Sequence, residues 1–372
     1  MRNYNFTRQR LFSGFDGATC KASPRIATDG HDVFLSWHMI KLCGSDVCFR
    51  VDMTKTSDGV NFTEPKPLLG LSDIYTDEER IQPDANIVYN KKYGKWFGIG
   101  RTTHYRNDKH PVLLGEDKPT GGITVSGDPL FFEFDTEKQD FFNMQKVDFP
   151  FPYLCSTPFS FYELESGEML FGFYYNTPTN PEFFDIQILK YDVSGECPRF
   201  IEAGAPIKRH DIERGLSEPE IVKFRGKYYM TIRSNENAFL AESTDGLNYS
   251  EPRLWRFDDG ELLGSVNTQQ HWLLGGDGEL YLCYTRKTPY NDHVIRNRAP
   301  IFMTRFDTER DCLIRDEEMP LVPELGARLG NFRIINLSEK EKWLAVCEWM
   351  QPIGCEKYGS DNSVWLVKIK FD

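Results

Sequence analysis

The chain has 372 residues, of which 40% are hydrophobic and 14% aromatic, and its formal net charge is −12. This acidic balance argues against nucleic acid or an anionic membrane as the main partner. No segment approaches the roughly 18 apolar residues of a membrane span, and the start MRNYNFTRQR lacks the apolar core of a signal peptide. Cysteines within apolar runs favour a reducing compartment. We therefore expect a cytoplasmic protein, or a secreted one only if a signal peptide has been removed.

Strand-like segments joined by tight turns follow one another along the whole chain. After a first segment at 4–12, six pairs of segments rich in β-branched and aromatic residues predict β-hairpins. A glycine marks the turn in five pairs, and Glu341 marks it in the sixth. The predicted hairpins cover residues 23–39, 82–101, 156–175, 217–233, 267–286 and 330–349.

An aspartate recurs along the chain, each time closing or following another short apolar run. The mean interval is about 63 residues, so the chain holds six units of a repeat architecture. Each unit then contains two hairpins, or four antiparallel strands, which make one blade of a propeller. We expect the aspartate side chains to be structural and to bind backbone amides of their turns. The recurring residues are Asp58, Asp135, Asp192, Asp245, Asp307 and Asp372.

These two patterns predict an all-β fold, a six-bladed β-propeller with four antiparallel strands per blade, formed by residues 1–372 as a single domain. The last aspartate ends the chain, so the sixth blade lacks its outer strand. We expect the N-terminal segment 4–12 to fill that place beside residues 363–371 and so to close the ring.

One face of the ring is expected to carry the functional site. The long loops 102–127, 175–184, 287–298 and 349–362 lie where the first strands of the blades start and the second strands end. Three arginines at equivalent strand ends favour an anion site, because a guanidinium fork binds a carboxylate or sulfate through two hydrogen bonds. The residues at the six equivalent ends, three of which are the arginines, are His38, Arg101, Tyr174, Arg233, Arg286 and Glu348.

Carboxylates at the starts of the first strands are candidates for a general acid or base. They are Asp84, Glu218 and Glu220, and Arg25 occupies the same place in the first blade.

The segment YTRKTPYNDHVIRNRAP concentrates more polar chemistry than a spacer loop requires. It combines Arg286, Tyr290, Asp292, His293 and Arg298. Other histidines expected on the same face are His38, His104 and His271, although a single histidine is more often structural than catalytic.

Two turns and one longer segment resemble the sialidase superfamily. The runs TSDGVNFTEP and STDGLNYSEP look like a shortened Asp-box turn, and residues 217–252 resemble the fourth sialidase blade. The resemblance implies an anionic-sugar site in which Glu218 and Arg233 match a family glutamate and arginine. It also implies that Arg25 matches the first family arginine, and that Arg298 or Arg296 matches the third.

The chain departs from the sialidase pattern at the start of the last blade. Where the family has a tyrosine nucleophile, this sequence reads LGNFRI, with Asn331 and Phe332. Asp84 is the nearest candidate for the family's acid/base aspartate. The resemblance therefore implies a sialidase-like scaffold without the tyrosine that forms the covalent intermediate.

Three functions are compatible with these residues. The first is a glycoside hydrolase acting on an acidic or polar sugar, with Glu218 and Asp84 as its carboxylates. The second is a lyase, in which His271 or His293 removes a proton next to a uronate carboxylate. The third is a glycan-binding propeller without catalysis. We expect a carbohydrate partner, no cofactor and no metal. The candidate binding residues are Arg25, Arg101, Arg233, Arg286, Arg298, Tyr290 and Trp272, where Trp272 serves as a sugar platform or as packing between blades.

Overall fold

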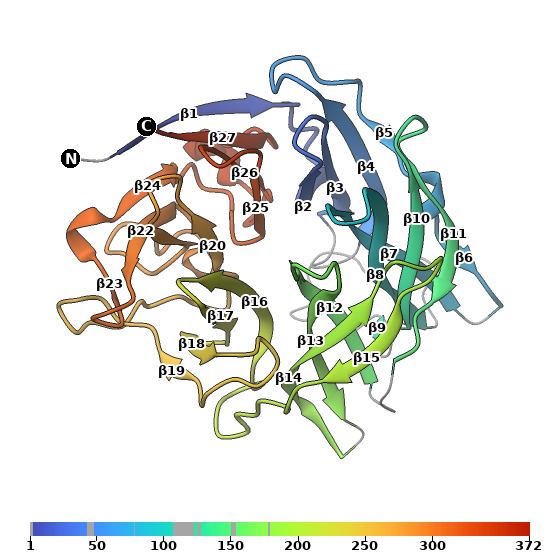
Figure 1. Cartoon of the computed structure of the whole chain (residues 1–372). Helices are drawn as coiled ribbons and strands as arrows, with labels where there is room; N and C mark the ends of the chain where they lie inside the picture. The colour runs from blue at the N-terminus through green and yellow to red at the C-terminus, as the bar shows by residue number, and fades with distance from the viewer. Residues whose placement is uncertain are drawn as a thin grey trace.

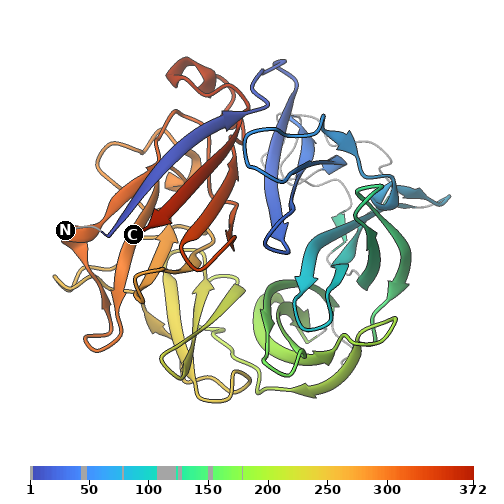
Figure 2. The same cartoon turned by 45° about the horizontal axis from the view of Figure 1, so that its top comes forward.

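The strands of the computed structural model form six antiparallel sheets arranged around a central axis (Figure 1). A view tilted by 45° shows the sheets standing radially around that axis (Figure 2). The structure describes residues 3–42, 48–77, 79–106, 123–124, 128–149, 154–177 and 179–372. The prediction of an all-β, six-bladed propeller is confirmed.

The first three blades are built in chain order from the axis outward. Blade one contains β2 (Thr19–Thr28), β3 (Val33–Lys41), β4 (Cys48–Thr56) and β5 (Lys66–Pro67). Blade two contains β7 (Glu79–Asn90), β8 (Lys95–Arg106), β10 (Pro129–Asp135) and β11 (Asp140–Lys146), with the short strands β6 (Ile74–Tyr75) and β9 (Ile123–Thr124). Blade three contains β12 (Leu154–Glu163), β13 (Met169–Thr177), β14 (Asn180–Asp192) and β15 (Arg199–Ala203).

The remaining blades follow the same order. Blade four contains β16 (Ser217–Phe224), β17 (Lys227–Arg233), β18 (Ala238–Ser243) and β19 (Arg253–Leu254). Blade five contains β20 (His271–Leu274), β21 (Leu280–Tyr284), β22 (Ile301–Asp307) and β23 (Cys312–Leu313), and β24 (Met319–Val322) also pairs with β22. Blade six contains β25 (Phe332–Asn336), β26 (Glu341–Cys347) and β27 (Val364–Phe371), with β1 (Tyr4–Leu11) as its outer strand.

Helical structure is limited to four short 3-10 turns in the described part of the chain. They are η1 (Leu69–Leu71), η2 (Ile295–Asn297), η3 (Arg315–Glu317) and η4 (Cys355–Tyr358). Among the residues that the structure describes, no helix is long and apolar enough to cross a membrane.

Two of the expected long loops differ from the prediction. β13 runs to Thr177 and β14 starts at Asn180, so most of residues 175–184 is strand. In the second blade β8 continues to Arg106, and most of the remaining loop to residue 127 lies outside the described residues. In blade three the backbone pairing of β13 with β14 continues beyond the predicted end of the hairpin at residue 175, with Thr177 opposite Asn180.

The turns between strands have the structures that the sequence predicted. Gly226 and Gly278 lie in the turns of their hairpins and have φ angles of +82° and +80°. Residues other than glycine rarely adopt such positive angles. Five of the recurring aspartates accept hydrogen bonds from amides two or three residues further on, which confirms their structural role. The accepting carboxylates are Asp58, Asp135, Asp192, Asp245 and Asp307.

The apolar core lies in the gaps between neighbouring blades. Trp255, Trp272 and Phe306, for example, fill the gap between blades four and five together with Tyr229. Similar buried clusters join each of the other five pairs of neighbouring blades. Because each blade buries both faces against its neighbours, the strands that surround the axis are held at fixed distances from one another.

The N-terminal strand closes the ring as predicted. β1 pairs with β27 antiparallel over its whole length, from Tyr4 opposite Phe371 to Leu11 opposite Val364. Figure 1 shows the two chain ends side by side in this blade.

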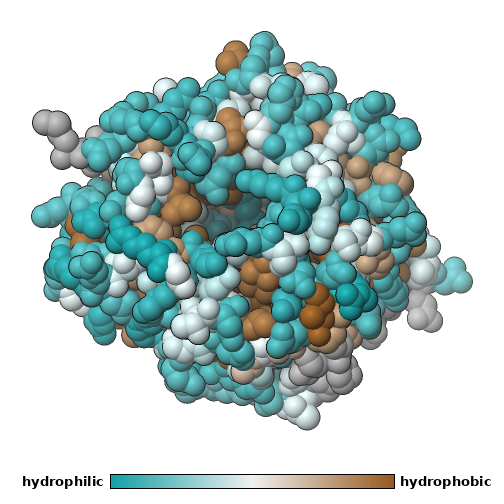
Figure 3. Space-filling view, viewed as in Figure 1, coloured by the Kyte–Doolittle hydropathy of each residue, from teal (hydrophilic) through white to brown (hydrophobic). Residues whose placement is uncertain are grey.

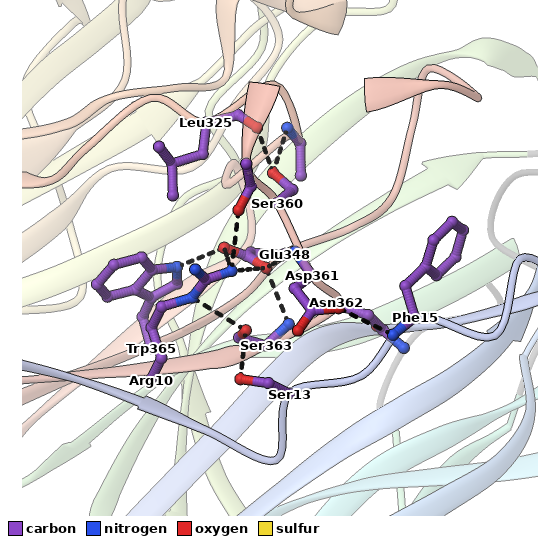
Figure 4. A network of polar contacts seen from close by, with 12 residues as sticks. Arg10, Ser13, Phe15, Leu325, Glu348, Ser360, Asp361, Asn362, Ser363 and Trp365 are labelled. Atoms are coloured by element: carbon purple, nitrogen blue, oxygen red, sulfur yellow. Dashed lines mark hydrogen bonds and ion pairs between the residues drawn. The ribbon is translucent and has the colours of Figure 1, made fainter. Parts of the chain in front are cut away.

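A polar network joins the two ends of the chain next to this strand pair (Figure 4). Its centre is Glu348, which is 1% exposed. The carboxylate accepts hydrogen bonds from Arg10 Nη2 at 3.1 and 3.2 Å and from Trp365 Nε1 at 2.9 Å. It also accepts hydrogen bonds from the amides of Asp361 at 2.8 Å and Ser363 at 2.9 Å. One buried carboxylate therefore connects β1 to the last turn of the chain.

Replacing Glu348 by alanine should destabilise the fold by about 3 kcal/mol or more, because it leaves several donors buried without an acceptor. The free energy of unfolding in denaturant measures this effect. Glu339→Ala is the matched control, since Glu339 is exposed and should change that free energy by less than about 0.5 kcal/mol. Equal unfolding midpoints for the two variants would contradict a central role of Glu348 in ring closure.

Candidate functional site

A cavity of about 160 Å³ opens on the axis where the first strands of the blades start and the second strands end. This is the face on which the sequence placed the site. Figure 3 views the ring from the side of the tight hairpin turns, and that opposite face is mostly hydrophilic and hollowed near its centre. The lining residues come from strands of five blades and from the segment that leads into β20 of blade five. They are Ser23, Pro24, Arg25, His38, Asp84, Asn86, Arg101, Phe159, Tyr174, Glu218, Gln269, Asn331 and Arg333.

Arg25 and Asp84 form the centre of one side of the cavity. Arg25 Nη2 donates to Asp84 Oδ2 at 2.5 Å, and Arg25 Nε donates to Asn86 Oδ1 at 3.1 Å. A bulge in the pairing of β2 with β3 lies just before Arg25, where Ser23 has a φ of +48°. Bulges commonly re-aim side chains near functional sites, and here the side chain beyond the bulge reaches across to blade two.

His38 completes this cluster. Its Nε2 lies 3.0 Å from Asp84 Oδ1 and 2.8 Å from Arg25 Nη1. Since an imidazole nitrogen either carries a proton or accepts one, Nε2 donates to Asp84 when protonated and accepts from Arg25 when not. Burial tends to raise the pKa of Asp84, but the nearby charges of Arg25 and His38 and the His38 hydrogen bond hold it well below its usual range. Asp84 therefore stays ionised in this cluster.

Glu218 occupies another side of the cavity and is also paired with an arginine. Its Oε2 forms an ion pair with Arg233 Nη1, and its Oε1 accepts from Gln269 Nε2 at 3.1 Å. Arg233 Nε also donates to Asn267 Oδ1 at 2.8 Å. Burial tends to raise the pKa of Glu218, but the charge of Arg233 and the hydrogen bonds from Arg233 and Gln269 lower it below its ordinary value. Glu218 is thus a charged base at neutral pH.

The backbone at Glu218 deviates from a regular strand. Glu218 has a φ of +47°, and the register between β16 and β17 shifts between Ser217 and Glu220. A positive φ at a residue other than glycine is a strained conformation that is found preferentially at functional sites. The bulge lets Glu218 and Glu220, two residues apart, line two different cavities.

The second cavity, of about 140 Å³, adjoins the first and shares Arg25, Asn86, Phe159 and Arg333 with it. Here Glu220 forms an ion pair with His271 Nδ1. His271 is 1% exposed and its ring lies 4.5 Å from that of Phe332.

The structure brings four of the predicted site residues together at the first cavity. Arg25, Arg101, Asp84 and Glu218 all line it. Arg233 is not among the lining residues but holds Glu218 in place. His271 lines only the second cavity.

Arg298 is buried and is linked to the site through neighbouring residues. Its guanidinium donates to Asn331 Oδ1 at 3.3 Å and to the carbonyl of Asn267. Burial, together with the charges of Arg233 and Arg328, lowers its pKa well below the ordinary value.

Other predicted site residues lie away from both cavities. Arg286 forms a two-fold ion pair with Glu318, at 2.7 and 2.6 Å, and His293 Nε2 lies 3.0 Å from Glu324 Oε1. Tyr290 is 59% exposed, and it does not line either cavity. Trp272 is 5% exposed, and its Nε1 donates to the carbonyl of Glu220, so it packs between blades and is not a sugar platform in this structure.

Sequence reasoning missed Arg333, Phe159, Gln269 and Asn86. Arg333 follows Phe332 on β25, the innermost strand of blade six. Phe332 is buried in the core between blades, and strand alternation turns the next side chain to the other side. That alternation was the available signal for Arg333. Within the described residues, no cluster of three or more His, Cys, Asp or Glu side chains could hold a metal ion.

No protein-family model and no curated protein matches this sequence. Among solved structures, a protein of unknown function from Dyadobacter fermentans matches with a TM-score of 0.69, 13% identity and 100% coverage of both chains. The NanB sialidase of Streptococcus pneumoniae matches with a TM-score of 0.65 and 13% identity over 98% of this chain and 70% of that one. The Trypanosoma rangeli sialidase matches with a TM-score of 0.61 and 12% identity over 99% of this chain. The match spans 59% of the length of that sialidase. The chain thus shares the propeller fold of these sialidases.

Proposed function

We propose that this protein is a glycoside hydrolase that acts on a sugar bearing an acidic group. One observation carries the proposal: Asp84 and Glu218, from different blades, line the same cavity, and each is held ionised by an arginine. Glycoside hydrolysis commonly uses one carboxylate as base and one proton donor on either side of the bond that is cleaved. Glu218 supplies the carboxylate, and Asp84, being ionised, can hold a neighbouring proton donor in place. The structural likeness to sialidases supports a glycan as the substrate.

In the proposed reaction Glu218 acts as the base. Its lowered pKa suits a group that accepts a proton, and the contacts of its two oxygens with Arg233 and Gln269 fix its orientation. A water molecule loses a proton to Glu218 and adds its oxygen to the anomeric carbon. The bond from that carbon to the leaving oxygen breaks at the same time.

The leaving oxygen needs a proton, and His38 is the group placed to supply it. When Nε2 of His38 is protonated, Asp84 at 3.0 Å stabilises the charge of the imidazolium. After transfer, Nε2 can accept from Arg25 at 2.8 Å, so both protonation states have a partner. His38 thus takes the acid role for which the sequence had offered Asp84.

The products of the reaction test this proposal. We expect glycosides of acidic sugars to release new reducing ends without the ultraviolet absorbance of an unsaturated uronate. An unsaturated product would instead show a lyase. Binding without any product would show that the cavity only recognises glycans.

The lyase is the second candidate because His38 and Tyr174 line the same cavity as Arg101. In that reaction His38 would remove the proton next to a uronate carboxylate, Tyr174 would protonate the leaving oxygen, and an arginine would neutralise the carboxylate. His271, the base considered from the sequence, is buried and lines only the second cavity.

A further inference from the structure

The two adjoining axial cavities share one wall, and Arg333 is part of it. Arg333 lies on β25 and lines both cavities, together with Arg25, Asn86 and Phe159. Its guanidinium carbon lies 4.0 Å from the centroid of the Phe159 ring and 6.0 Å from that of Phe161. This stacking orients the planar group and leaves its edge available for hydrogen bonding.

Arg333 differs in its partners from arginines that the sequence predicted for the site. Arg25 is paired with Asp84, Arg233 with Glu218 and Arg286 with Glu318. In the part of the chain that the structure describes, the Arg333 guanidinium has neither a hydrogen bond nor a carboxylate within ion-pair distance. Its five N–H donors therefore have no protein acceptor among these residues, and the side chain lines both cavities.

The charge of Arg333 persists despite its position. Burial lowers its pKa to about 10, with Glu220 opposing the shift, so the side chain remains cationic at neutral pH. An enclosed cation without a partner costs free energy, and a protein that only needed to fill this wall would do better with an uncharged side chain. Such a cost is typical of residues kept for binding rather than for stability.

We propose that Arg333, stacked on Phe159 at the boundary of the two cavities, binds the acidic group of the sugar. The ligand class is a sugar carrying an oxyanion, either a carboxylate on the ring or a sulfate ester, since both present two oxygens to a guanidinium edge. This inference rests on the proposed function only in taking the ligand to be a sugar. It assigns the anion specificity to a residue outside the arginines that the sequence had indicated.

The binding of simple sugars to the full chain tests the inference without any turnover. Ligand-observed NMR titrations would compare D-glucuronate, D-glucose 6-sulfate and D-glucose. We expect at least one of the acidic sugars to bind about tenfold or more tightly than glucose, because a charge-assisted pair is gained. The preferred acidic sugar identifies the oxyanion as carboxylate or sulfate.

The variant Arg333→Gln should reduce this preference to near unity, while Arg333→Lys should keep only part of it, because a point charge lacks the planar fork. Arg199→Gln is the matched control, since Arg199 is 71% exposed and paired with Asp192 on the outer part of blade three. It should leave the preference unchanged. Phe159→Leu removes the stacking and keeps the charge, so it should weaken the preference even if Arg333→Gln does not fold.

Unfolding measurements separate a binding role from a structural one. If Arg333 is retained for a ligand, Arg333→Gln should unfold at the same denaturant concentration as the wild type or at a higher one. A preference for acidic sugars that survives in Arg333→Gln would overturn the inference. So would a wild-type chain that does not distinguish either acidic sugar from glucose, even if it cleaves glycosides. Conversely, loss of the preference in a chain that cleaves nothing would support the inference and refute the proposed function.

Discussion

We expect Glu218→Gln to lower turnover on the order of 10²-fold or more, because the substitution removes the base while keeping its shape. The amide oxygen can still accept from Arg233, and Gln269 can rotate its own amide to accept from the new NH₂ group. The fold should therefore persist, with an unfolding midpoint close to that of the wild type. Glu251→Gln, at an exposed position next to β19, is the control and should retain full activity.

The pKa of Glu218 adds a pH dependence to this prediction. Burial alone would raise the pKa, but Arg233 and the hydrogen bonds bring it below the ordinary value of 4.5. The charged form that acts as a base is therefore present above that value and is lost only as the pH falls through the lowered pKa. We therefore expect protonation of Glu218 to reduce the activity of the wild type only below pH 4.5.

Near-full activity of Glu218→Gln would remove this residue from the proposed chemistry. A reaction initiated by His38 on a uronate would then be the better explanation, and the product assay described above would decide it. A loss of activity together with a loss of folding would not support the catalytic role, which is why the unfolding midpoint is measured on the same sample.

The fold could be predicted from the sequence because its signals repeat. Each aspartate turn is a local device, and a carboxylate that accepts from the amides of the next two or three residues needs no distant partner. The closure by residues 4–12 followed from counting, since the sixth unit was one strand short. Errors arose only where strand pairing outlasted the local signals, as at Thr177.

The position of the cavity was predictable from the sequence, and its lining residues were less so. Equivalent strand ends do lie on one face, and His38, Arg101 and Tyr174 line the cavity together. Which partner an arginine takes is decided by segments distant in sequence, and Arg286 pairs with Glu318, which lies 32 residues further on. Periodicity carries no information about such pairs, because the loops that supply the carboxylates do not repeat.

Removing residues 1–12 should make the chain aggregate and lower its stability by several kcal/mol. β1 covers the outer edge of β27, whose sequence VWLVKIKF would otherwise present an open, largely apolar strand edge. The deletion also removes Arg10 from the buried Glu348 carboxylate, a loss of the size found when one partner of a buried ion pair is deleted. It further removes Arg8, which donates to the carbonyls of Leu321 at 2.6 Å and Pro320 at 2.7 Å and so ties blade six to blade five.

Light scattering and thermal unfolding would measure the effect of this deletion. A chain lacking only residues 1–2 is the control, because Asn3 still accepts from the amide of Asp372 at 2.9 Å and the β1 ladder stays intact. A synthetic peptide of residues 3–12 should restore a monomeric, more stable ring when added to the truncated chain, since the missing strand supplies its own register against β27. If the truncated chain stays monomeric with unchanged unfolding, the edge of β27 does not need its partner, and ring closure is not what the N-terminal strand contributes.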